Sequence, residues 1–407
     1  MLNPYLLMAL LYLAVGALTA LDASLTSFSL LGWIAGLRWL RVHFITLGVM
    51  SEVIFGVTPA LVALAHGRPR PKIRWDIWLT LNMGLVILLV GIPIINQAMI
   101  FTGGALIFVA ASLLSWQLWQ LRSPHSASPR REETGSLKFY LTGLAFLLLG
   151  ITIGTGLWLG WSGPLCIQVP LETHIHANNW GFMSLVFAGL LLDVLPGLTG
   201  HALAPRRTVN ILFWGISLGA LFLVIGPWLG GNLWFTVPGL VMHLSATLAL
   251  LVLTIRRLSA AGKLAQAGSW HLITSYLWIL APVMVAPLII LGVPGFPGPL
   301  IEATAPQALI YGWVLQFGMA LIPYFARRTF LKDTSATLGG SWLSVGAANV
   351  GSALIWAGIF LTGMTGQLHG VAYILFAVAM LAVFAEMTGT VRTALHRMEE
   401  IEAAAGP

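Results

Sequence analysis

The chain has 407 residues, of which 58% are hydrophobic and 8% are charged. This composition lies outside the range of soluble domains and predicts an integral membrane protein. The net charge of +7 would suit a nucleic-acid partner, but the cations are confined to short segments between apolar runs, so we expect no nucleic-acid binding. The single cysteine, Cys166, excludes an internal disulfide and a thiolate metal cage.

The lengths of the apolar runs set the number of helices. Residues 77–121 carry no formal charge, and one helix of that length would measure roughly 68 Å, whereas a bilayer core is about 30 Å thick. This run must therefore turn back once, between Gly91 and Gln97. The runs are continuously apolar rather than alternating, which argues against a β-barrel. We predict an all-α polytopic membrane protein with twelve transmembrane helices, at approximately 5–22, 42–64, 76–92, 97–120, 138–160, 175–195, 208–229, 233–255, 270–293, 305–325, 341–361 and 368–388.

Basic residues are distributed unequally between the two predicted sides of the membrane. Eighteen of the twenty Lys and Arg residues fall in alternate loops or in the C-terminal tail: Arg68, Arg70, Lys72, Arg74, Arg122, Arg130, Arg131, Lys138, Arg206, Arg207, Arg256, Arg257, Lys263, Arg327, Arg328, Lys332, Arg392 and Arg397. By the positive-inside rule, this asymmetry predicts a multi-pass protein of the inner (plasma) membrane with both termini in the cytoplasm. The other two, Arg38 and Arg41, lie on the outer side, just before the second helix.

Two stretches of the chain repeat each other. The segment RVHFITLGVMSEVIFG at 41–56 aligns without gaps with HIHANNWGFMSLVFAG at 174–189, which places His43 on His176. In a weaker third copy, YGWVLQFGMA, Trp313 takes the histidine position, and each interval between copies is close to one third of the chain. We predict a single transmembrane domain over 1–407, built from three repeats of four helices at approximately 1–124, 125–260 and 261–407.

Ten histidines divide between the two predicted sides. Those beside the basic loops are expected to be ordinary interfacial residues: His66, His125, His201, His271 and His396. The outer five lie on even-numbered helices: His43, His174, His176, His243 and His369. An imidazole inside the membrane is costly unless it is paired or coordinated, so the outer set predicts a functional site. Neutral imidazole ligates haem iron, copper and zinc; the alternative for each histidine is an interhelical hydrogen bond.

His174 and His176 are two residues apart and therefore point about 200° apart on a regular helix. We do not expect them to bind one small ion together. We predict that His176 is the one that points into the helix bundle as a ligand, because its repeat partner His43 has the same register. His174 is left to a second site or to the surface.

This arrangement predicts roles for several other charged residues. Glu52 lies nearest the middle of the membrane and is our candidate for a proton path; the alternative is a protonated glutamic acid hydrogen-bonded across helices. Asp193 and Glu386 are expected to reach the basic interface. If the outer histidines hold a haem, Arg38 and Arg41 would pair with its propionates; otherwise they anchor the second helix at the headgroups.

The helix count, the stretch LGVMSEVIFG after His43, and HIHANNWGFMSLVFAGLLLDVLP on the sixth helix together resemble the haem-copper oxidase subunit I superfamily. The resemblance is closer to divergent, NnrS-type haem- and copper-containing membrane proteins than to a respiratory oxidase. It implies a haem, expected to be of b-type, with His43 as an axial ligand. It also implies copper bound through His176 or His174, with His43 as a further candidate metal ligand.

The chain departs from that family at two helices. The seventh helix lacks the family's paired histidines, and the tenth has Ile310 and Gly312 where the family has ligands. Oxygen reduction at a standard haem-copper centre is therefore not expected. A haem on His43 would take His243 or His369 as its second ligand, or would be five-coordinate.

Three functions remain open from the sequence. The first is a haem- or copper-binding redox protein in electron transfer or in the handling of nitric oxide or another diatomic, with an electron-donor protein as its partner; whether it is an oxidoreductase enzyme is undecided. The second is a proton-coupled transporter, indicated by Glu52. The third is a structural subunit without cofactor that binds other membrane subunits.

Overall fold

The computed structural model describes residues 2–25, 30–34, 36–122 and 135–405. Within them the regular structure is entirely helical, which confirms the all-α prediction. Eleven helical segments in these ranges are long and apolar enough to cross a bilayer. A twelfth, α4 (Trp75–Gly91), is apolar and about 26 Å long, and the chain is therefore a polytopic membrane protein.

The helices group into two compact units. Unit 1 comprises Met1–Gly56 and Gly262–Pro407, and unit 2 comprises Val57–Ala261. The boundary between the two lies inside one helix, α3 (Ser51–Ala65). Each unit has its own set of contacting helices.

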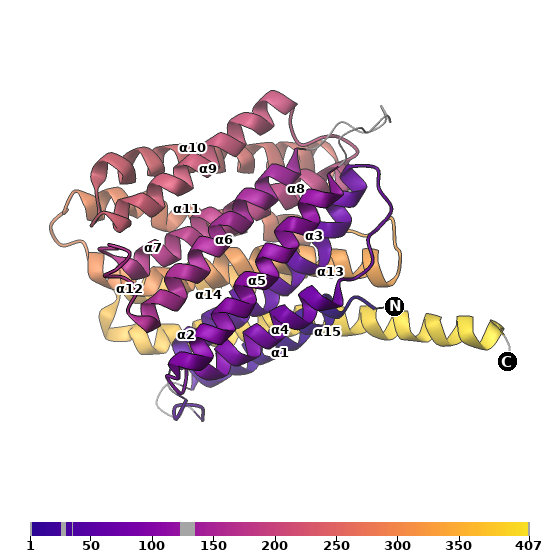
Figure 1. Ribbon diagram of the computed structural model, residues 1–407, viewed down its shortest axis with the longest axis horizontal. Helices are drawn as coiled ribbons and strands as arrows, with labels where there is room; N and C mark the ends of the chain where they lie inside the picture. The colour runs from indigo at the N-terminus through magenta and orange to yellow at the C-terminus, as the bar shows by residue number, and fades with distance from the viewer. Residues whose placement is uncertain (1, 26–29, 35, 123–134, 406–407) are drawn as a thin grey trace. The chain divides into compact units, whose positions relative to one another are not determined.

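Unit 2 contains, after α3 and α4, the helices α5 (Gln97–Leu121), α6 (Ser136–Leu159), α7 (Pro170–His176), η3 (Ala177–Met183), α8 (Ser184–Thr199), α9 (Arg206–Trp228) and α10 (Leu233–Ala260). The helices α9 and α10 run side by side, as do α4 and α5 (Figure 1). Glycine allows the first pair to approach closely: a Cβ added to Gly219 would lie 2.7 Å from the backbone nitrogen of His243. Small residues commonly serve this purpose between helices in lipid.

Unit 1 contains α1 (Pro4–Ser24), α2 (Leu37–His43), η2 (Phe44–Met50), the start of α3, α11 (Ala267–Ile290), α12 (Gly298–Leu309), η4 (Ile310–Leu315), α13 (Gln316–Phe330), α14 (Trp342–Phe360), η5 (Thr362–Met364) and α15 (Thr365–Ala405). The long helix α15 contacts α1, α13 and α14. The side chain of Asn3 caps α1 and also donates to the carbonyl of Gly56, which fixes the start of the first span against α3.

The second helix of each predicted repeat is the most buried. The span Gly298–Phe330 is buried over the whole of its apolar window, and the spans Pro170–Thr199 and Leu37–Ala65 are buried over 78% and 67% of theirs, against 29–56% for the other spans among the described residues. The other spans therefore present more of their surface to lipid. The buried spans include the helices on which His43 and His176 lie.

Each of these three buried spans contains a π-helical segment. The segments η2, η3 and η4 begin at residues 44, 177 and 310, so that one and the same interval separates successive copies. Aligned on these segments, Leu309 takes the histidine position in the third copy, one helical turn before Trp313, which the sequence alignment had placed there. Leu309 and Trp313 are one turn apart and therefore lie on the same helix face. For this reason the sequence pattern alone does not decide which of them corresponds to His43 and His176. The repeat boundaries themselves stay a prediction.

The predicted helices overlap the observed ones throughout the apolar middle of each span. The predicted turn between Gly91 and Gln97 is confirmed, since α4 ends at Gly91 and α5 begins at Gln97. The second span begins earlier than predicted, at Leu37, and α15 continues well beyond residue 388, to Ala405. Some predictions lie outside the described residues, namely those for His125, Arg130 and Arg131 and for the repeat boundary at 124–125.

Candidate functional site in the two units

The five outer histidines do not belong to one unit. His43 and His369 lie in unit 1, whereas His174, His176 and His243 lie in unit 2. His43 and His176 are the last residues of α2 and α7, and a π-helical segment follows each directly. Such segments are rare and occur frequently at functional sites.

In unit 2, His176 is oriented by a neighbouring helix. Its Nδ1–H donates to the carbonyl oxygen of Leu223 on α9, at 2.6 Å. A carbonyl can only accept, so the proton of the neutral ring lies on Nδ1, and Nε2 carries the lone pair. Metal-binding histidines use this second-shell arrangement to fix the tautomer and the ring orientation.

His243 is buried next to the ring of Trp180. The indole lies 5.3 Å from the His243 ring and 6.3 Å from the His176 ring, centroid to centroid. His243 Nε2 donates to the carbonyl of Trp180 at 3.3 Å, and its Nδ1 lies 3.4 Å from the hydroxyl of Thr247. Both ring nitrogens of His243 therefore have partners, and this histidine does not offer a free ligand atom.

His174 faces a different helix from His176. Its Nδ1–H donates to the carbonyl of Gly150 on α6 at 2.9 Å, and a Cβ added to Gly154 would lie 2.5 Å from its ring. The two histidines thus contact α6 and α9 respectively, as their spacing predicts. Among the described residues, no group of three or more His, Cys, Asp or Glu side chains is close enough to hold a metal ion. The donors predicted for copper, His174, His176 and His43, are not such a group.

In unit 1, His43 has the same tautomer as His176. Its Nδ1–H donates to the carbonyl of Trp39, one turn earlier on α2, at 2.8 Å. The rings of Trp39 and His43 are stacked, with centroids 3.8 Å apart and an angle of 19° between their planes. The indole therefore holds the imidazole plane, and Nε2 again carries the lone pair.

The two outer arginines form a polar cluster with residues of α12 and α15. Arg38 donates to the carbonyl of Ala303, and the guanidinium of Arg41 lies 5.2 Å from the ring centroid of Tyr373. The amide of Gln307 is 2.6 Å from the hydroxyl of Tyr373. With its oxygen turned toward Arg38, this amide accepts from the guanidinium at 3.2 Å and donates to the hydroxyl, which satisfies both groups.

Neutral groups hold these two cations. Within the described part of the chain, neither Arg38 nor Arg41 forms an ion pair. His369 on α15 interacts electrostatically with Arg38, while its Nε2 is buried and lacks a hydrogen-bond partner among these residues. That nitrogen lies over Gly358, where an added Cβ would be 2.8 Å away. Unit 1 thus carries positive charge near His369 that forms no ion pair among the described residues.

The intramembrane carboxylates have different surroundings. Glu52 is fully buried and interacts electrostatically with Tyr12 of α1, whose ring fits where Gly48 has no side chain. Asp193 accepts a hydrogen bond from Tyr140 at 2.7 Å. Glu386 forms an ion pair with Arg327 at 2.5 Å and accepts from the backbone of Gly340. Asp193 and Glu386 therefore have structural partners. The proton path through Glu52 stays a prediction.

The inner histidine His271 is packed inside unit 1 rather than exposed at its surface. It is fully buried, and its Nε2 lies 2.8 Å from the hydroxyl of Ser344. That hydroxyl donates to the carbonyl of Ser341, so the His271 nitrogen must be the donor in this contact. The apolar cover comes from packing between α11 and α14, which the nearby basic loop does not reveal.

Sequence reasoning missed Trp39, Trp180, Gln307 and Tyr373. Three of them share one signal: an aromatic residue lies four positions from a predicted histidine on the same helix, as in Trp39–His43, His176–Trp180 and His369–Tyr373. Residues at this spacing lie on the same helix face. Gln307 has no such signal, because its partners lie on other helices.

Neither protein-family models nor curated protein sequences give a match to the chain.

Proposed function

We propose that the chain is a haem-binding redox protein of the plasma membrane, acting in electron transfer or in the binding of nitric oxide or another diatomic. One observation carries the proposal: His43 and His176, at equivalent positions of two repeats, each end a helix before a π-helical segment and each donate Nδ1–H to a backbone carbonyl. This geometry leaves Nε2 as the basic atom at both positions, which is the form that binds iron. The resemblance to the haem-copper oxidase superfamily supports the same assignment.

The residues of unit 1 fit a haem with one protein ligand. His43 would bind the iron through Nε2, and the guanidinium groups of Arg38 and Arg41, which form no ion pair among the described residues, would bind the propionates through charge-assisted hydrogen bonds. The iron would supply a one-electron couple. Neither His243 nor His369 offers a further ligand, since both nitrogens of His243 are bonded and Nε2 of His369 lies against Gly358.

The chain's own residues orient and shield this site. Stacking on Trp39 holds the His43 ring, and the buried pair of Gln307 and Tyr373 holds the two arginine side chains in place. The donor set does not fit copper in the same way, because copper sites in this superfamily need several imidazoles and the described residues bring no three ligands together. We therefore favour haem over copper.

The proposed orientation follows the positive-inside rule. The ends of the helices that carry most Lys and Arg residues would face the cytoplasm, and both termini with them. Arg38, Arg41 and His43 would then lie toward the opposite side, where an electron-donor protein or another membrane subunit would reach the haem edge.

The test is the visible spectrum and metal content of the purified protein. Wild-type protein is expected to show a Soret band and about one iron per chain. His43→Ala should remove both, Arg38→Gln with Arg41→Gln should lower haem occupancy, and the control His396→Ala, whose side chain is 72% exposed, should match wild type. His176→Ala should retain the haem.

Two results would contradict the proposal. A wild-type protein without haem or iron after expression with excess haem would refute the redox function. Loss of haem in His176→Ala but not in His43→Ala would move the site to unit 2. A colourless chain that co-purifies with other membrane proteins would instead support a structural subunit.

A second candidate function is proton-coupled transport, favoured by the complete burial of Glu52 beside Tyr12. A buried carboxyl group inside a membrane commonly marks a proton path. Transport would be measured as proton flux in proteoliposomes. Loss of flux in Glu52→Gln, with flux retained in Glu400→Gln, would favour this function, and equal flux with and without protein would eliminate it.

A further inference from the structure

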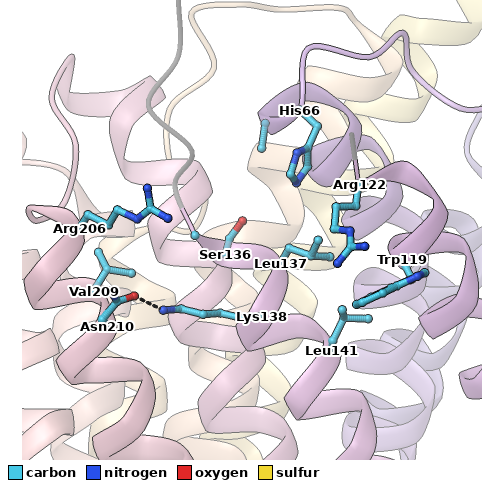
Figure 2. Close-up of a pocket in the computed structure, with 12 residues that line it drawn as sticks. His66, Trp119, Arg122, Ser136, Leu137, Lys138, Leu141, Arg206, Val209 and Asn210 are labelled. Atoms are coloured by element: carbon cyan, nitrogen blue, oxygen red, sulfur yellow. Dashed lines mark hydrogen bonds between the residues drawn. The ribbon is translucent and has the colours of Figure 1, made fainter. Parts of the chain in front are cut away.

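Unit 2 has a basic pocket that the proposed haem site does not use. It encloses about 350 Å³ among the ends of α3 and α5 and the starts of α6 and α9. Figure 2 shows Arg206 and Asn210 on one side and Arg122, Trp119 and His66 on the other, with the first residues of α6 between them. These helix ends are among those that carry the basic loops.

Among the described residues, three cations and no carboxylate line this pocket. Arg122, Lys138 and Arg206 are all lining residues. None of the three forms an ion pair within the part of the chain that the structure describes. Lys138 and Arg206 lie close enough for their charges to repel each other. The arrangement is therefore unfavourable for the protein alone and favourable for an anion.

Neutral groups hold the cations in position. The guanidinium of Arg122 lies 3.7 Å from the ring centroid of Trp119. The ammonium of Lys138 donates to the amide oxygen of Asn210 and lies 4.7 Å from the ring centroid of Phe213. Aromatic faces and amides orient a cation without cancelling its charge. The charges are thus preorganised around the pocket.

A further set of donors points to an oxyanion. The helix α6 begins after Gly135, which supplies no side-chain cap, so its first backbone N–H groups and its positive end adjoin the pocket. Phosphate matches this combination of guanidinium, ammonium and N–H donors.

We propose that this pocket binds the phosphate of an anionic phospholipid headgroup. Leu137, Leu141 and Val209 also line it, which suits the glycerol and first acyl carbons of a lipid better than a free, fully hydrated anion. Basic pockets between transmembrane helices bind anionic headgroups by the same combination. The site is independent of the haem proposal, since the two use different units and different residues.

Native mass spectrometry of the full chain, released from micelles with defined lipids, tests this binding. Phosphatidylglycerol adducts should exceed phosphatidylcholine adducts on the wild-type protein. The double variant Lys138→Gln with Arg206→Gln should weaken phosphatidylglycerol binding about 25-fold, at about fivefold per cation removed. The charge-matched control Arg207→Gln with Arg256→Gln removes two exposed cations of the same unit that do not line the pocket and should bind as wild type.

The source of the phosphate is tested by competition with inorganic phosphate. Persistence of the phosphatidylglycerol adduct supports the lipid; displacement at equal concentration, still sensitive to the pocket variant, would overturn the lipid assignment in favour of a free anion. Equal loss of binding in the pocket and control variants would overturn the site itself. Arg206→Lys keeps the charge and should bind phosphatidylglycerol as wild type does, which separates an effect of lost charge from an effect of lost folding.

Discussion

The contact between α9 and α10 gives the sharpest test of the packing in unit 2. A Cβ at Gly219 would lie 2.7 Å from the backbone nitrogen of His243, 2.9 Å from its Cβ and 3.0 Å from its Cα. Ordinary van der Waals contact begins near 3.4 Å, so Gly219→Ala forces a displacement of about 0.7 Å. The opposing atoms belong to a helix backbone and cannot rotate away, so the helices must separate.

The cost of this separation follows from the neighbouring contacts. Overpacking by one methyl group costs about 1–3 kcal/mol. Alanine in place of helical glycine returns about 0.5–1 kcal/mol. The separation also opens the contact at Gly239, where an added Cβ would lie 2.9 Å from the backbone nitrogen of Leu223. We expect a net loss of about 1–2 kcal/mol, or about 2–8 °C in Tm for a unit of roughly 200 residues.

The assay is thermal unfolding of the detergent-purified protein, followed by fluorescence of its 17 tryptophans. The matched control is Gly346→Ala on α14, where an added Cβ meets nothing within 4 Å. The control should be neutral or slightly stabilising, because only helix propensity changes. A Tm for Gly219→Ala at or above that of Gly346→Ala would refute the close approach of the two backbones.

Two further substitutions test the carboxylates that have structural partners. Glu386→Gln should destabilise the protein by about 1.5–3 kcal/mol, because it removes the anion paired with Arg327. The control Glu400→Gln, on the exposed end of α15, should change Tm little. Equal shifts in Tm for the two variants would contradict a structural ion pair. Tyr140→Phe should cost about 1–3 kcal/mol by removing the hydroxyl that donates to Asp193, measured by the same unfolding assay, and an unchanged Tm would show that this hydrogen bond contributes nothing net.

The sequence predicts the spans well because their lengths are set by the bilayer. The uncharged run at 77–121 is too long for one crossing, and the observed break falls between Gly91 and Gln97 as expected. The ends of the helices are less well predicted, because hydropathy reports only the membrane-embedded part of a helix. The residues of α15 beyond 388 are charged but good helix formers, and the helix continues to Ala405.

The interval between the repeats was readable from the sequence, but its third register was not. Trp313 and Leu309 are one turn apart on the same helix face, and only the start of η4 selects Leu309 as the counterpart of His43 and His176. A π-helical segment depends on how the backbone is held by surrounding helices, and local propensity does not encode it.

What the sequence alone determined is the class of the protein, the positions of its spans and the set of histidines and arginines that are costly to place in a membrane. Only the tertiary structure decided what these side chains do. It divides the histidines between two units, gives His243 two hydrogen-bond partners, and gathers Arg38 and Arg41 around Tyr373. The physical reason is that the cost of burying a polar group depends on its own chemistry, whereas the group that satisfies it comes from another helix, distant in the sequence.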